Sequence, residues 1–173
     1  PAMDELDGSR VAPAIAEHNL HPARHDFEGV LRRGETPAAD DVVLLTSFWA
    51  DRDGLPGLRL IDRDGRTLHH WQADPARIWP VSPYRDLVAG MFNKSSNYVH
   101  GSVLLPNGDV VFNIEFLGLV RMNAAGEVLW RLDRRTHHSV TQDHEGNFWV
   151  CGMRWIETEE QLRGRFAGLE LPL

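Results

Sequence analysis

An internal repeat constrains the fold of this chain more than any other feature. A shift of 61 residues superposes "GLRLIDRDGRTL" (57–68) on "GLVRMNAAGEVL" (118–129), so that Gly57 meets Gly118. A shift of 38 residues superposes "HGSVLLPNGDVVF" (100–112) on "HSVTQDHEGNFWV" (138–150), so that His100 meets His138. Self-similarity of this kind is typical of an architecture built from stacked supersecondary units.

The repeated segments carry the pattern of antiparallel strands. Short runs rich in β-branched and aromatic residues are separated by "DRDG", "PNGD", "AAGE" and "HEGN", which favour tight hairpin turns. The runs are "VVLLTSFW" (42–49), "LRLID" (58–62), "VVFNIEF" (110–116), "LVRMN" (119–123) and "FWVCGM" (148–153). The sequence therefore predicts an all-β, antiparallel protein.

Four short strands in about 40 residues are typical of one β-propeller blade. We expect residues 41–173 to form two to three four-stranded blades, with an insertion near 72–98, after an irregular or short helical segment at 1–40. All six tryptophans are expected in the core between blades, with Trp71 and Trp130 closing the outer hairpins. Closed propellers have at least about four blades. The chain is therefore expected to be part of a larger propeller, or to close by association with itself or with a missing half.

Composition is that of a globular domain, with 42% hydrophobic and 25% charged residues. The formal net charge of −7 argues against nucleic acid or an anionic membrane surface as the main partner. No apolar run approaches the roughly 20 residues of a membrane span. Cys151 is the single cysteine and is expected to be inert core, because reactive thiols need an electropositive, partly exposed site.

Three segments in order carry a family resemblance: "GLRLIDRDGRTLHHW", "VHGSVLLPNGDVVFNIEFLGLVRMNAAGEVLWRLD" and "THHSVTQDHEGNFWV". Together they resemble the arylsulfotransferase (aryl-sulfate sulfotransferase) β-propeller family over roughly residues 42–155. The resemblance implies a six-bladed propeller whose histidines point into a central channel. It also implies transfer of a sulfuryl group from a phenolic sulfate ester to another phenol, and a periplasmic or membrane-anchored extracytoplasmic location.

The family resemblance also implies that one channel histidine is transiently sulfated, while other histidines, an arginine and an asparagine hold the sulfate oxygens. His138 is the first candidate for the nucleophile, with His100 as donor and partner; His137 is a lower-ranked alternative. The candidate substrate-binding residues are Arg154, Asn113, His137 and Glu115. Ser102 and Val140 stand two positions after the repeated histidines, where the enzymes have an asparagine at one blade.

The repeat itself gives the histidines a chemical meaning. His100 and His138 each precede the turn glycine by eight residues, so both are expected on an innermost, channel-lining strand. Neutral imidazole is a nucleophile, and imidazolium is a charge-assisted donor to sulfate oxygens. Both histidines can instead be structural, hydrogen-bonding between strands, and Arg154 can equally be a surface charge.

Other chemistries have weaker support. The spacing His137, His138 and His144 on a strand and its turn does not suit a zinc site, so no metal is expected. His144 is expected in solvent, and His69 and His70 at the periphery. Phosphate-binding loops, dinucleotide glycine motifs and a serine nucleophile elbow do not occur, and no cofactor is expected. Two functions remain: an arylsulfotransferase-like enzyme, and a propeller that serves only as a binding or interaction module.

Overall fold

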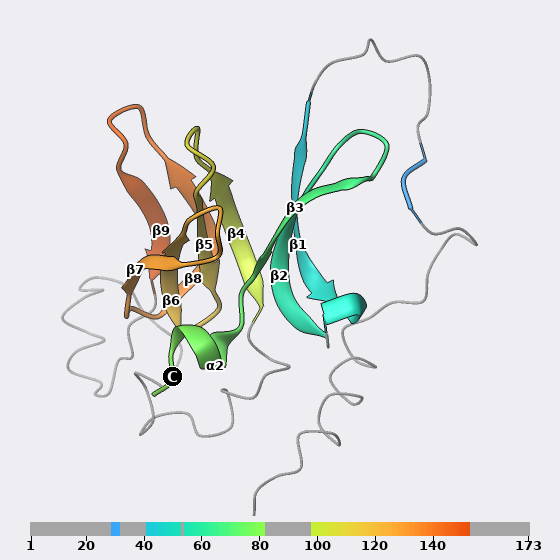
Figure 1. Cartoon of the computed structure of the whole chain (residues 1–173). Helices are drawn as coiled ribbons and strands as arrows, with labels where there is room; N and C mark the ends of the chain where they lie inside the picture. Colours follow the sequence, from blue (N-terminus) through green and yellow to red (C-terminus); the bar gives the residue numbers. More distant parts are fainter. Residues whose placement is uncertain (1–28, 32–40, 53, 82–97, 153–173) are drawn as a thin grey trace, which may run out of the picture.

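The computed structural model describes residues 29–31, 41–52, 54–81 and 98–152, and its architecture is all-β (Figure 1). The described part contains nine strands in three antiparallel sheets, a single 3-10 turn at Ala50–Arg52 and one short helix, α2 (Pro75–Ile78). The first sheet has the order β1 (Val43–Trp49), β2 (Leu55–Ile61), β3 (Thr67–Gln72). The second sheet has the order β4 (Val99–Leu104), β5 (Val110–Ile114), β6 (Gly118–Met122), β7 (Val128–Leu132). The third sheet pairs β8 (Thr136–Gln142) with β9 (Phe148–Gly152).

Four hairpins close with the same turn, as the glycine-containing segments predicted. In each turn, the residue three positions before the glycine donates its amide to the carbonyl of the residue that follows the glycine. The glycine amide in turn donates to the carbonyl of that same earlier residue. The four glycines have φ between 80° and 87°, a left-handed conformation that residues with a side chain rarely adopt. They are Gly65, Gly108, Gly126 and Gly146.

The 61-residue repeat is a repeat of strand register. Leu58 pairs with Trp71 in the first sheet, and the equivalent Leu119 pairs with Leu132 in the second. Both pairings slip at the same place, between residues 60 and 61 and between residues 121 and 122. The hairpin β2–β3 is therefore equivalent to β6–β7, and β1, which pairs with β2 as β5 pairs with β6, is equivalent to β5.

The 38-residue repeat makes β8–β9 equivalent to β4–β5. Ser102 pairs with Phe112, and Val140 pairs with Val150 thirty-eight residues later. The pairing is interrupted just before these positions in both hairpins, between Val99 and Ser102 and between His137 and Val140. Both interruptions are register shifts of the kind that a β-bulge produces, and we call them bulges; the two repeated histidines lie in them.

The three sheets lie side by side, and the packing between neighbours also repeats (Figure 1). Strands β1 and β2 contact β4 of the next sheet, and the equivalent strands β5 and β6 contact β8. One core cluster between the first and second sheets includes Leu58, Trp71 and Phe112. A second cluster between the second and third sheets includes Val111 and Val140, with Trp130 packed against it. Trp71 and Trp130 thus both pack between sheets.

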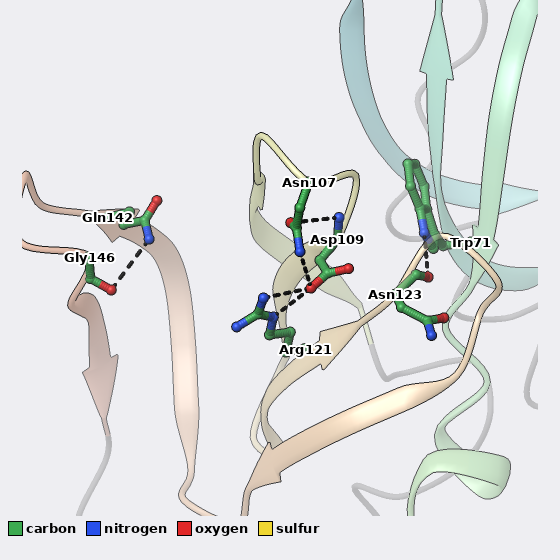
Figure 2. Close-up of polar contacts among 7 residues, drawn as sticks. All are labelled: Trp71, Asn107, Asp109, Arg121, Asn123, Gln142 and Gly146. Atoms are coloured by element: carbon green, nitrogen blue, oxygen red, sulfur yellow. Dashed lines mark hydrogen bonds and ion pairs between the residues drawn. The ribbon is translucent and has the colours of Figure 1, made fainter.

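Polar contacts join the first sheet to the second. The Trp71 indole Nε1 donates to the Asn123 carbonyl at 3.0 Å, in the β6–β7 turn (Figure 2). Nε2 of His69 lies 2.8 Å from the Ala124 carbonyl in the same turn. Within the second sheet, Arg121 reaches Asp109 Oδ2 through Nε at 2.9 Å and a terminal nitrogen at 2.6 Å (Figure 2). His69 was predicted at the periphery; in the structure its ring contacts the second sheet.

Two predictions about burial are wrong. Cys151 is exposed on β9, and 66% of Trp149 is exposed on the same strand. The reason is that β9 packs through Phe148 and Val150 against the second sheet, so the alternating residues face outward. No other sheet covers that outward face within the described residues.

Parts of the predicted organisation lie outside the described residues. Of the segment 1–40, the structure describes only 29–31, and of the region 72–98 it describes 72–81, with α2, and Tyr98. In the part of the chain that is described, no helix is long and apolar enough to cross a membrane.

Candidate functional site

The two bulges bring the repeated histidines together at one end of the sheets. His100 lies in the bulge of β4, His138 lies in the bulge of β8 directly after His137, and Glu115 directly follows β5. Bulges bend a strand and redirect its side chains, so equivalent positions in neighbouring sheets can converge. The rings of His100 and His138 have centroids 5.6 Å apart.

A glycine permits this convergence. A Cβ atom on Gly101 would lie 2.3 Å from the amide nitrogen of Val140 and 2.6 Å from the Cα of Ser139. The backbones of β4 and β8 are therefore in direct contact beside the histidines, and no side chain fits between them. The "HG" in "HGSVLL" thus combines a functional candidate with the residue that allows β8 to approach.

The three imidazole rings form one cluster. His137 and His138 have ring centroids 3.8 Å apart and meet edge to face. The His100 ring stacks on that of His137 at 5.6 Å, with an interplanar angle of 24°. The Phe116 ring packs against the His137 ring, with the two centroids 4.7 Å apart. Sequence spacing predicted the pair His100 and His138; the central position of His137 was not expected.

Glu115 joins two of the histidines through its two carboxylate oxygens. Oε1 lies 2.9 Å from Nε2 of His137, and Oε2 lies 3.2 Å from Nε2 of His100. The Glu115 side chain is only 16% exposed, and its backbone amide donates to the Tyr98 carbonyl at 2.9 Å. Nε2 of His100 is buried and makes no hydrogen bond, despite its approach to Glu115. The cluster therefore contains a buried ring nitrogen that approaches the Glu115 carboxylate without a well-directed hydrogen bond.

Asn113 positions the backbone of His138. It is fully buried on β5, and its Nδ2 donates to the His138 carbonyl. His138 has a φ of 60°, an uncommon conformation for a residue with a side chain. Thr136 Oγ1 lies 3.5 Å from the Asn113 Oδ1, so both ends of the amide face β8. The structure thus gives Asn113 a positioning contact with His138, a contact that its place in the sequence did not indicate.

An aromatic strip connects the cluster to the first sheet. Tyr98 lies 6.1 Å from the His100 ring and 5.0 Å from the Phe48 ring, measured between centroids. Sequence analysis did not single out Tyr98 or Phe116. Their positions two residues before His100 and directly after Glu115 are the signal that could have done so.

The remaining predicted residues do not join the described cluster. Arg154 lies outside the described residues. The His144 side chain is 92% exposed in the β8–β9 turn, as predicted. Among the residues that the structure describes, no group of three or more His, Cys, Asp or Glu side chains has a geometry that could hold a metal ion.

Comparison with known proteins adds little to this description. No family model and no curated protein matches the chain. A solved structure, of a protein of unknown function from Bacteroides caccae, aligns with a TM-score of 0.31 and 20% sequence identity. The alignment covers 54% of this chain and 31% of that one, so the match spans about a third of the neighbour's length. A likeness at this level identifies neither a fold nor an activity. The fold and the site themselves define an all-β protein with a histidine–glutamate cluster between two equivalent sheets.

Proposed function

We propose that the three sheets are blades of a β-propeller and that the histidine cluster is the transfer site of an arylsulfotransferase-like enzyme. The repeated register and the repeated packing of each sheet on the next support the blade assignment. In this assignment β4 and β8 are innermost strands, which line the channel in a propeller. The observation that carries the function is the convergence of His100, His137 and His138 around Glu115.

The proposed reaction has two displacement steps. A neutral imidazole nitrogen of His138 attacks the sulfur of an aryl sulfate, the bond from sulfur to the aryl oxygen breaks, and the phenolate leaves with the electron pair. A second phenol then attacks the same sulfur and gives up its proton, which the first phenolate takes up through solvent; the nitrogen–sulfur bond breaks and the histidine is restored. No oxidant, reductant or cofactor is consumed in either step.

The geometry suggests a division of labour among the rings. His137 can donate from Nε2 to Glu115, a contact that fixes the tautomer and orientation of the ring. Among the described residues, His138 contacts the other two rings and no carboxylate, which leaves its ring nitrogens for the proposed attack. His100, whose Nε2 lies 3.2 Å from Glu115 without a well-directed hydrogen bond, is the candidate donor to a sulfate oxygen. Of the six candidate site residues, all but Arg154 lie in the cluster or against it. Arg154 keeps its proposed role as a clamp on the sulfate.

Transfer from p-nitrophenyl sulfate to phenol tests this proposal, with p-nitrophenol release followed by absorbance. His138→Asn is the sharpest variant, because asparagine tolerates the left-handed backbone of residue 138 but lacks the imidazole. We expect a loss of about 10⁴-fold or more in kcat. His144→Asn, in the exposed turn, is the matched control and should retain activity. Unchanged turnover in His138→Asn would remove His138 as the nucleophile.

A non-catalytic binding module is the alternative. The Nδ2 of buried Asn113 already donates to the His138 carbonyl, so it is not free to hold a sulfate oxygen as a transferase site would need. That alternative predicts that the wild-type chain binds an aryl sulfate without releasing phenol. Binding measured by calorimetry, together with the absence of turnover, would decide in its favour.

A further inference from the structure

The first sheet has an outward face whose equivalent in the second sheet is covered. We call it the front face; it carries Val43, Leu45, Trp49, Arg59 and His70, which register places on the same side. Val43 and Leu45 are 44% and 38% exposed. Their equivalents in the second sheet, Val110 and Phe112, are fully buried by the first sheet.

The front face also carries polar atoms without partners. Trp49 Nε1, Arg59 Nε and His70 Nε2 are buried atoms with no hydrogen bond. The equivalent of His70 in the second sheet, Arg131, donates to the Ile78 carbonyl in the segment that follows the first sheet. The second sheet thus uses this position for a contact with the preceding unit, and the described part of the chain offers the first sheet no such contact.

The opposite end of the array shows the complementary face. The back face of the third sheet carries Thr141, Trp149 and Cys151. Trp149 is 66% exposed, whereas its equivalent in the second sheet, Val111, is fully buried against the third sheet. Within the chain, the back face of each sheet covers the front face of the next one. Among the described residues, the first sheet and the third sheet thus present the two halves of the same contact, and no other sheet covers either half.

We propose that two copies of this chain associate head to tail, with the back face of the third sheet of one copy docked on the front face of the first sheet of the other. Three sheets from each copy give a ring of six, within the range of about four to eight blades of closed propellers. This closure rests on the blade assignment above. The histidine cluster is built within one chain, so its activity test is independent of this association.

Light scattering after size-exclusion chromatography of the full chain tests the association. Wild type should be a dimer, and Leu45→Arg and Trp149→Arg should each be a monomer, because each places a charge in one half of the contact. Val81→Arg, at an apolar residue that follows α2 and is 70% exposed, is the control and should remain a dimer. Circular dichroism of all variants establishes that each is folded.

Mixing the two monomeric variants distinguishes this contact from a symmetric one. The Leu45→Arg chain keeps its back face and the Trp149→Arg chain keeps its front face, so the mixture should form a heterodimer through one intact contact. A contact of like faces would contain only one of the two substituted residues, so one of the single variants would remain a dimer. That outcome, a monomeric wild type, or dimers that survive both substitutions would each overturn the proposal.

Discussion

At the residue scale, the conformation of His138 is held by groups that the repeat places around it. A left-handed residue with a side chain is uncommon, and here Asn113 donates to its carbonyl while Gly101 admits the strand that carries it. The cost of this conformation is therefore offset by contacts with neighbouring strands. Such an arrangement fits a residue that is positioned for chemistry.

Glu115→Gln tests the carboxylate between the rings. Glutamine can still accept a hydrogen bond from His137 but carries no charge, so the imidazoles lose their anionic partner. We expect kcat for transfer from p-nitrophenyl sulfate to fall by about 10²-fold or more, with a smaller change in KM. A rise in KM alone would show that Glu115 acts in binding and not in the transfer step.

Asp143 gives a prediction of pH dependence. Hydrogen bonds from Trp149, and further bonds from the turn amides and Asn147, lower the pKa of Asp143 from 3.8 to about 2. Because the folded pKa lies below the unfolded one, the carboxylate stabilises the fold above pH 3.8, and this contribution disappears as the pH falls through about 2.

Melting temperatures of wild type and Asp143→Asn measure this contribution. The variant should melt lower than wild type at neutral pH, and the difference should close as the pH approaches 2. Glu145→Gln, in the same turn, is the control. A difference that stays constant over the whole range would contradict the assignment.

Residue pairing was the part of the site that sequence could predict. Equivalent positions in successive repeats placed His100 and His138 near one another, and their rings lie 5.6 Å apart. The role of His137 could not be predicted in this way, because a simple strand would point it away from His138. A bulge in β8 overrides that alternation, and bulges leave no clear mark in the sequence.

At the scale of elements, the close contact of β4 with β8 determines the geometry of the cluster. Gly101→Ala should destabilise the protein by roughly 1–3 kcal/mol, because its Cβ would meet the backbone of Ser139 and Val140. Gly152→Ala is the matched control, since a Cβ there has nothing within 4 Å, and its change should stay within about 0.5 kcal/mol. Urea unfolding gives both values. Equal stability of the two variants would show that the strands can separate without cost.

The sequence predicted the hairpins and their equivalence, but it did not predict which face of each sheet packs against a neighbouring sheet. The glycine turns and the 61-residue shift predicted pairings that the structure shows to share one register. Alternation along β9 gives two faces of similar apolar character, and it does not say which one meets another sheet. Cys151 and Trp149 lie on the uncovered face, which is why both were wrongly expected in the core.

At the scale of the whole molecule, three sheets that share equivalent strands pack side by side with one repeated contact, and the histidines lie where the second and third sheets meet. The all-β class was predicted from sequence and is confirmed, while the propeller and its closure are proposals that rest on the repeated packing. Head-to-tail association would extend the same contact to the two ends of the array. The cluster itself needs only the second and third sheets.

A covalent intermediate tests the central claim most directly. The wild-type chain is incubated with p-nitrophenyl sulfate in the absence of an acceptor phenol, quenched and digested, and the peptide that contains His138 is examined by mass spectrometry. The proposed reaction predicts a sulfuryl group on His138 in wild type, none in His138→Asn, and its disappearance when phenol is added. Release of p-nitrophenol with no adduct on any histidine of the cluster would contradict the account.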